Sequence, residues 1–264
     1  MRLPPIIGHR GARAHAPENT LAGIAEAVRL GARWVEFDVK LTRDNVAVLM
    51  HDDTLAATTG VERKMAETDF ADLARLDTLP SFRARYPGAG RDFVARHGDG
   101  PVRIPTLEEA LRLVLDLGLG VNIEIKPCPG RARETAAIVL GVARLFWPRF
   151  RPPPLVSSFS IASLVTAQNL APDWPRGLLF GRVPAHWRDL AARLDAATIN
   201  VDAARLTPER VAALCDTGRP VLAWTVNRPE RARNLLRWGV SALFTDRPGS
   251  LLQATPRQGR QGMS

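Results

Sequence analysis

The chain has 264 residues, of which 45% are hydrophobic and 24% are charged, and its formal net charge is +9. This length fits one large domain, and the composition is ordinary for a protein with a sizeable core. No apolar run is long enough to span a bilayer, and the only two cysteines, Cys128 and Cys215, lie far apart, so we expect neither membrane insertion nor a disulfide framework.

The positive charge does not indicate a nucleic-acid partner. Only three residues are lysine, the arginines are scattered along the chain, and no run of five basic residues occurs. Net charge without such a cluster is weak support for nucleic-acid binding, so we expect none.

From the N-terminus onward, apolar runs of strand length alternate with helical patterns. The first residues, MRLPPIIGHRG, lack the apolar segment and cleavage site of a signal peptide, so we expect a cytoplasmic protein. The expected strands are PIIG (5–8), WVEFDV (34–39), VAVLM (46–50), VNIEIK (121–126), LVSSF (155–159), GLLF (177–180), TINV (198–201), VLAWTV (221–226) and ALFTD (242–246). The expected helices are Thr20–Leu30, Thr106–Leu117, Arg133–Phe146, Ile161–Leu170, Thr207–Asp216 and Pro229–Trp238.

This alternation predicts an α/β fold with a parallel sheet covered by helices, either a closed barrel or a doubly wound sheet. Nine strand-like runs are one too many for a barrel of eight strands. The connection at residues 40–45 is also too short for a helical crossover between parallel strands. One run there must pair as a hairpin, or an extended segment must replace a helix.

Two segments depart from the alternation. Residues 53–103 are rich in Arg, Asp, Gly and Pro, with one weakly helical piece, TDFADLARL. This is too long for an ordinary connection, so we expect an insertion beside the functional site. Residues 253–264 are expected to form a disordered tail. No internal repeat or interdomain linker is present, which predicts a single domain over residues 1–264.

Polar side chains recur where the expected strands end, and in a barrel the functional groups collect at those ends. Residues two apart on a strand face the same side. The polar and aromatic residues at these positions are His9 and Arg10 after the first run, Glu36 and Asp38 in the second, His51 after the third, Asn122, Glu124 and Lys126 in the fourth, Trp224 and Asn227 in and after the eighth, and Asp246 at the last.

Three of these residues suit a metal ion. Glu36, Asp38 and Glu124 would repel one another at the mouth of a barrel unless a cation lay between them. Ligands that are all carboxylates favour a hard divalent cation, Mg²⁺ or Ca²⁺, over Zn²⁺.

Four basic residues suit a phosphodiester. Arg10 and Lys126 supply positive charge for a phosphate. His9 and His51 have an ordinary pKa near neutral pH and can transfer protons. Together with a cation, these groups are what the cleavage of a phosphodiester needs.

Each feature has a structural alternative when it is taken alone. A histidine at a strand end is more often a hydrogen-bonded structural residue, and an E-x-D pair is usually a solvated edge. Trp224 suits a core position, and Glu18 suits the positive end of the first helix. The recurrence of these groups at successive strand ends favours the catalytic interpretation.

Seven segments, in chain order, resemble the glycerophosphodiester phosphodiesterase family: HRGARAHAPENT, EFDVKLTRD, LMHDDTL, IPTLEEAL, NIEIKP, AWTVN and LFTDRP. The resemblance runs from Gly8 to about Pro248 and is closest to the compact cytosolic bacterial members. It implies a TIM-type (β/α)8 barrel, slightly irregular around the second and third strands, with a small insertion after the third.

The resemblance also implies an activity, the metal-dependent hydrolysis of glycerophosphodiesters such as glycerophosphocholine and glycerophosphoethanolamine. The products are an alcohol and glycerol 3-phosphate, formed through a cyclic phosphate. The implied roles are His9 and His51 as the acid/base pair, Arg10 and Lys126 as phosphate contacts, Glu36, Asp38 and Glu124 as ligands of one divalent cation, Glu18 and Asn19 as a supporting pair, and Trp224 as an aromatic wall.

Three other functions stay open at this point. A lysophospholipase D would need an apolar groove, and the insertion at 53–103 is a candidate for lining it. A barrel that binds phosphodiesters without cleaving them is disfavoured because both histidines and all three carboxylates are present. A phosphodiesterase acting on nucleic acid is compatible with the net charge. We expect a small-molecule substrate, and the sequence leaves the oligomeric state open, monomer or homodimer.

Overall fold

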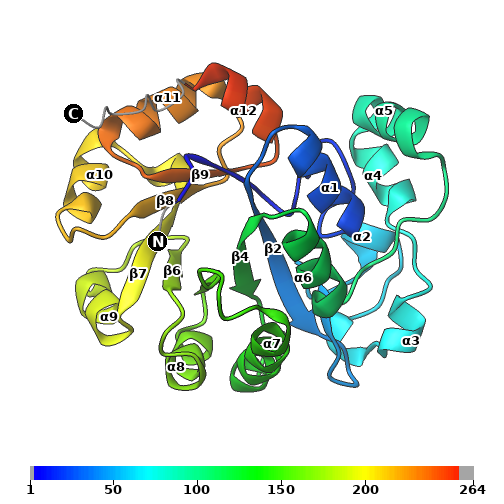
Figure 1. The fold of residues 1–264 in the computed structure, drawn as a ribbon, viewed down its shortest axis with the longest axis horizontal. Coiled ribbons are helices and arrows are strands. Elements are labelled where there is room, and N and C mark those ends of the chain that lie inside the picture. Colours follow the sequence, from blue (N-terminus) through cyan, green and yellow to red (C-terminus); the bar gives the residue numbers. More distant parts are fainter. Residues whose placement is uncertain (1–2, 256–264) are drawn as a thin grey trace.

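A computed structural model describes residues 3–255 of the chain (Figure 1). Within these residues nine strands form one sheet, and the sheet closes into a barrel because β1 pairs with both β9 and β2. The strands are β1 (Ile6–Gly8), β2 (Trp34–Leu41), β3 (Ala47–Leu49), β4 (Gly120–Ile125), β5 (Leu155–Ser158), β6 (Arg176–Phe180), β7 (Ala196–Asp202), β8 (Val221–Trp224) and β9 (Ala242–Thr245). All except β3 pair in parallel around the barrel, so the expected TIM-type barrel is confirmed.

The strand in excess of eight is β3, which pairs antiparallel with β2 as a hairpin. Val39 lies opposite Leu49, so β3 runs back along β2 toward its middle. The backbone N–H of Met50 then donates to the Asp38 carbonyl at 3.0 Å, so Met50 is level with Asp38 and His51 follows it directly. Of the two arrangements that the short 40–45 connection allowed, the chain adopts the hairpin.

Helices separate the parallel strands and surround the barrel (Figure 1). They are α1 (Leu21–Arg29), α6 (Leu107–Asp116), α7 (Ala132–Phe146), α8 (Ile161–Leu170), α9 (Trp187–Arg193), α10 (Pro208–Cys215), α11 (Pro229–Trp238) and α12 (Pro248–Ala254), with a 3₁₀ turn, η2 (Ala203–Arg205), after β7. None of the helices among residues 3–255 combines the length and the apolar character that crossing a membrane requires.

Two of these helices, α9 and α12, were not predicted from the sequence. Both are only seven residues long, which leaves little room for a periodic apolar pattern. Because α12 continues to Ala254, the first two residues of the expected tail at 253–264 are helical. Residues 256–264 of that tail lie outside the described part of the chain.

The segment between β3 and α6 forms a layer of short helices on one flank of the barrel, drawn in cyan and blue-green in Figure 1. It contains α2 (Ala56–Thr59), η1 (Met65–Glu67), α3 (Phe70–Leu73), α4 (Leu79–Arg85) and α5 (Pro87–His97). The sequence predicted only one helical piece here, because Pro87, Gly88 and Gly90 give α5 a weak intrinsic helix propensity. Packing decides instead: Phe82 and Phe93 bury their rings against Ala16, in the loop after β1.

Alternate residues of β2 face opposite sides of the sheet. Val35, Phe37 and Val39 belong to the apolar core between the barrel and its helices. Glu36 and Asp38 therefore face the barrel interior. This alternation, which the sequence spacing predicted, is what places charged groups inside the barrel.

The start of α6, where the chain returns from the insertion, is held by a capping box. The backbone N–H of Glu109 donates to the Thr106 hydroxyl at 3.2 Å, and the Thr106 N–H donates to the Glu109 carboxylate at 2.7 Å. In the sequence, Thr106 and Glu109 have the spacing of a capping box, and the structure forms that box.

Replacing the cap, Thr106→Ala, is expected to lower the free energy of unfolding by about 1 kcal/mol, because the Glu109 N–H loses its acceptor. Urea denaturation followed by circular dichroism measures the change. Thr166→Ala in α8 is the matched control, since its hydroxyl only donates back to the Ala162 carbonyl within the helix. An equal loss in both variants would contradict a capping role.

Candidate active site

Three buried carboxylates lie together at the mouth of the barrel. In the parallel register of β2 and β4, Asp38 is level with Glu124, and Glu36 is level with Asn122. Glu36, Asp38 and Glu124 are 2%, 1% and 8% exposed, and one oxygen atom from each lies within 4.8 Å of the other two. Strand register thus brings together residues that are far apart in the sequence.

These carboxylates differ in how readily they ionise. Burial, followed by the charges of Asp38 and Glu124, raises the pKa of Glu36 well above its ordinary value. Burial and the Asp38 charge likewise raise the pKa of Glu124. Burial acts in the same direction on Asp38, but Arg10 and Lys126 outweigh it and hold the pKa of Asp38 well below its ordinary range.

The cluster fits a hard divalent cation. The Oε1 atom of Glu36 is buried and has no hydrogen-bond partner within residues 3–255. A buried carboxylate oxygen without a partner is costly. A cation such as Mg²⁺ or Ca²⁺, which prefers oxygen ligands, would satisfy this atom and relieve the repulsion among the three side chains.

Arg10 contacts two of the carboxylates from the turn after β1. Its backbone adopts φ 49°, and its N–H donates to Glu36 Oε2 at 2.9 Å. Its guanidinium Nε lies 3.2 Å from Asp38 Oδ2, and its Nη1 donates to Glu18 at 2.6 Å. The turn therefore positions the guanidinium through both the backbone and the side chain.

Glu18 and Asn19 support the site from behind. Glu18 accepts hydrogen bonds from Arg10, Arg13 and Arg85, which links the first loop to the insertion. The amide of Asn19 donates to Asp38 Oδ2 at 3.0 Å, and its oxygen accepts from the Asp38 N–H at 3.1 Å. These contacts fix Arg10 and Asp38 in place rather than forming the wall of the cavity.

Lys126 completes the charge balance on the other side of the cluster. Its Nζ lies 3.0 Å from Glu124 Oε1 and 3.4 Å from Asp38 Oδ1. The same Nζ lies 5.4 Å from the centre of the Phe159 ring, within the range of a cation–π contact. One face of the ammonium group is thus bound to the carboxylates, while a second face is covered by an aromatic ring.

His9 is held in one orientation by a carboxylate from the last strand. Because an ionised carboxylate can only accept, the 2.7 Å contact means that His9 Nδ1 donates to Asp246. Asp246 in turn accepts from Asn227 Nδ2 at 2.6 Å. Burial lowers the pKa of His9, although Asp246 acts in the opposite direction. The Nε2 atom of His9, 4.0 Å from Glu36, stays available for proton transfer.

His51 has the same arrangement with a different partner. Its Nδ1 lies 2.6 Å from Asp52 Oδ1, and this hydrogen bond lowers the pKa of Asp52. The His51 side chain is 27% exposed, compared with 12% for His9. Both imidazoles therefore bond to a carboxylate through Nδ1, which leaves each Nε2 atom available to contact a bound ligand.

A cavity of about 200 Å³ opens where these groups meet. Its wall contains eight of the ten residues singled out from the sequence: His9, Arg10, Glu36, Asp38, His51, Glu124, Lys126 and Trp224. Trp224 and Phe159 meet edge to face, with ring centres 5.5 Å apart, and form an aromatic side of the cavity.

Sequence reasoning assigned no role to four residues that shape this site: Asp246, Asn227, Asp52 and Phe159. Asp246 and Asn227 stood out as polar residues at strand ends, but nothing in a single sequence paired them with His9 across the barrel. Asp52 adjoins His51 in the HDD stretch, which is a local signal. Phe159 follows β5 and looked like an ordinary apolar residue.

Comparisons with known proteins agree with this geometry. Residues 9–250 match the glycerophosphoryl diester phosphodiesterase family. A glycerophosphodiester phosphodiesterase of Caldanaerobacter subterraneus subsp. tengcongensis is 31% identical, over 96% of this chain and 98% of its own. Another, from Bacillus altitudinis, is also 31% identical, over 93% of this chain and 96% of its own.

Solved structures show the same similarity. A phosphodiesterase of Oleispira antarctica, solved in complex with its product sn-glycerol-3-phosphate, is 34% identical and superposes with a TM-score of 0.85, covering 96% of each chain. A structure from Silicibacter pomeroyi described as a glycerophosphoryl diester phosphodiesterase is 30% identical with a TM-score of 0.80, over 96% of this chain and 93% of its own.

Mg²⁺ or Ca²⁺ is expected to raise the melting temperature in mildly alkaline buffer, because a ligand that binds only the native state stabilises it. The increase should shrink as the pH falls, since protons compete for Glu36 and Glu124, whose pKa values are raised. Thermal denaturation with and without each metal, at several pH values, measures this dependence.

Glu36→Gln should abolish the metal-induced increase, because it removes a ligand from the cluster. Glu108→Gln is the matched control, since Glu108 lies on the exposed side of α6, where it pairs with Arg112. A full response of Glu36→Gln to the metal would rule out the carboxylate cluster as the binding site.

Proposed function

The chain belongs to the glycerophosphoryl diester phosphodiesterase family and is an enzyme of that class, and on this premise we propose what it hydrolyses and how. The proposed substrates are glycerophosphodiesters of small alcohols, such as glycerophosphocholine and glycerophosphoethanolamine, and the products are the alcohol and glycerol 3-phosphate. The observation that carries the proposal is the pair of carboxylate-bound histidines beside a buried carboxylate cluster.

The size of the cavity supports a small substrate. Pockets for drug-sized ligands typically measure 300–1,000 Å³, and this one measures about 200 Å³. Glycerol and phosphate groups suit that space better than a long acyl chain does. The aromatic side formed by Trp224 and Phe159 would lie against the carbon atoms of glycerol.

Charge complementarity supports the placing of the phosphate. A divalent cation held by Glu36, Asp38 and Glu124 would supply charge stabilisation to the phosphate oxygens. Arg10 and Lys126 would contact the same group, because both reach the cluster from the cavity wall. The planar fork of a guanidinium suits phosphate oxygens, and an ammonium group adds a point charge.

The histidines would move the protons. One imidazole accepts the proton of the neighbouring glycerol hydroxyl as that oxygen attacks phosphorus, and the other donates a proton to the departing alcohol oxygen. The resulting cyclic phosphate is then opened by water with the two roles reversed. Asp246 and Asp52, bonded to the Nδ1 atoms of His9 and His51, would keep each Nε2 directed at the reacting atoms.

The domain organisation, location and oligomeric state of the chain are separate from its chemistry. We propose that the chain works as one catalytic domain, in which the insertion at 53–103 contacts the site through Arg85 and Glu18. A cytoplasmic location stays a prediction from the sequence, which leaves the oligomeric state open between monomer and homodimer.

Release of glycerol 3-phosphate from glycerophosphocholine and glycerophosphoethanolamine is the direct test. We expect release from both in the presence of Mg²⁺ or Ca²⁺, and none with EDTA. Lysophosphatidylcholine is expected to react much more slowly, because the cavity is small. Turnover of the lysolipid alone would indicate a lysophospholipase D, and no turnover of any substrate by folded protein would indicate a barrel that only binds.

His9→Ala and His51→Ala should each lower kcat by at least a factor of about 100, the usual contribution of a positioned acid or base. The melting temperature should change little in His51→Ala, because that side chain lies at the cavity mouth. His186→Ala, a substitution on the exposed surface, is the matched control. Full activity in either of the first two variants would remove that histidine from the mechanism.

A further inference from the structure

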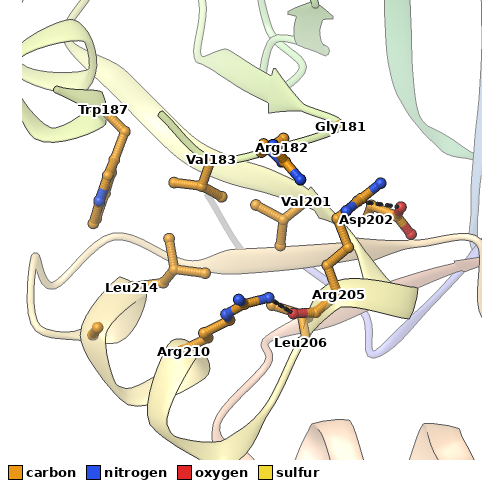
Figure 2. Close-up of a pocket in the computed structure, with 11 residues that line it drawn as sticks. Gly181, Arg182, Val183, Trp187, Val201, Asp202, Arg205, Leu206, Arg210 and Leu214 are labelled. Atoms are coloured by element: carbon orange, nitrogen blue, oxygen red, sulfur yellow. Dashed lines mark hydrogen bonds and ion pairs between the residues drawn. The ribbon is translucent and has the colours of Figure 1, made fainter. Parts of the chain in front are cut away.

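A second cavity, of about 410 Å³, lies outside the barrel, between α9 and α10 and beside the carboxyl ends of β6 and β7 (Figure 2). It shares no lining residue with the active-site cavity. None of the histidines and carboxylates of the active site lines it, so the proposed hydrolysis does not involve this cavity.

One end of this cavity is apolar. Figure 2 shows Trp187, Val183 and Leu214 toward one end, with Val201 between them and the opposite end. Trp187, Val201 and Leu214 are buried members of the core between the barrel and its helices, and Val183 packs against that core. Because these side chains are already fixed by packing, the apolar wall exists before any ligand binds.

The other end carries excess positive charge. Three arginines, Arg182, Arg205 and Arg210, line the cavity together with a single acidic residue, Asp202. Figure 2 shows Arg182 and Arg205 on the side of the cavity away from Trp187. The helix α10 contributes Arg210, which donates to the Arg205 carbonyl at 2.6 Å.

Most of the guanidinium donors at this end are available. Arg205 Nε lies 3.5 Å from Asp202 Oδ2, a long contact. Arg182 has neither an ion pair nor a side-chain hydrogen bond to any residue between 3 and 255. An anion placed between Arg182 and Arg205 would therefore gain charge-assisted hydrogen bonds without displacing strong partners.

From this polarity we propose that the cavity binds a single-chain anionic amphiphile, with its alkyl chain against Trp187 and Leu214 and its headgroup between Arg182 and Arg205. Burial of the chain supplies affinity in proportion to the apolar area removed from water. The arginines supply selectivity for an anionic headgroup over a neutral or cationic one. The proposal does not depend on the proposed hydrolytic activity, because it concerns different residues.

Isothermal titration calorimetry with decanoate, below its micelle concentration, tests the proposal on the full chain. Decanoate should bind, and decyltrimethylammonium, which has the same chain and the opposite charge, should not. The double variant Arg182→Gln/Arg205→Gln should weaken decanoate binding at least about tenfold, the effect of losing one charge-assisted hydrogen bond. Val183→Trp should abolish binding by filling the cavity.

Arg193→Gln is the matched control, because Arg193 is an exposed arginine of α9 that does not line the cavity. Its affinity for decanoate should equal that of the unchanged protein. Circular dichroism establishes whether each variant is folded. If the arginine double variant does not fold, Val183→Trp still tests whether decanoate binds in this cavity. No binding of decanoate, equal binding of the cationic analogue, or unchanged affinity in both cavity variants would overturn the proposal.

Discussion

The structure depends on how it balances three carboxylates buried at the mouth of the barrel. Glu36, Asp38 and Glu124 are forced together by the parallel register of β2 and β4. Burying like charges is costly unless they are paired. When all three are ionised, the two positive charges of Arg10 and Lys126 leave one negative charge in excess among these five side chains. A divalent cation would turn that excess into a single positive charge, which matches the single negative charge of a phosphodiester.

The backbone of the turn after β1 helps to pair these charges. Gly8 and Gly11 approach so closely that a Cβ atom on Gly8 would lie 2.3 Å from the Gly11 carbonyl oxygen. Gly11 itself has φ 83°, a conformation that glycine adopts without strain. This tight turn lets the Arg10 N–H reach the Glu36 carboxylate while its side chain reaches Asp38. The two glycines are therefore required by the geometry of the charged site as well as by the turn.

Orientation of the two histidines rests on contacts of different range. His51 bonds to Asp52, its neighbour in the chain. His9 instead bonds to Asp246, which lies 237 positions away in the chain. Burial alone would raise the pKa of Asp246, but the hydrogen bond with His9 and the other neighbours of Asp246 together outweigh burial, and the pKa falls to about 2. Closure of the barrel between β1 and β9 makes this contact possible, because it brings the first strand beside the last.

The alternation of strands and helices, the capping of α6 and the side of β2 that carries Glu36 and Asp38 could all be predicted from the sequence, because these features follow from local periodicity and capping chemistry. The three residues of the carboxylate cluster and both histidines were also predicted as site residues from the sequence. Three features became visible only in the folded chain: β3 pairs as a hairpin, Asp246 bonds to His9, and the insertion contains α4 and α5. Those outcomes depend on strand register and on packing between segments far apart in the chain, and such contacts leave no periodic signal in a single sequence.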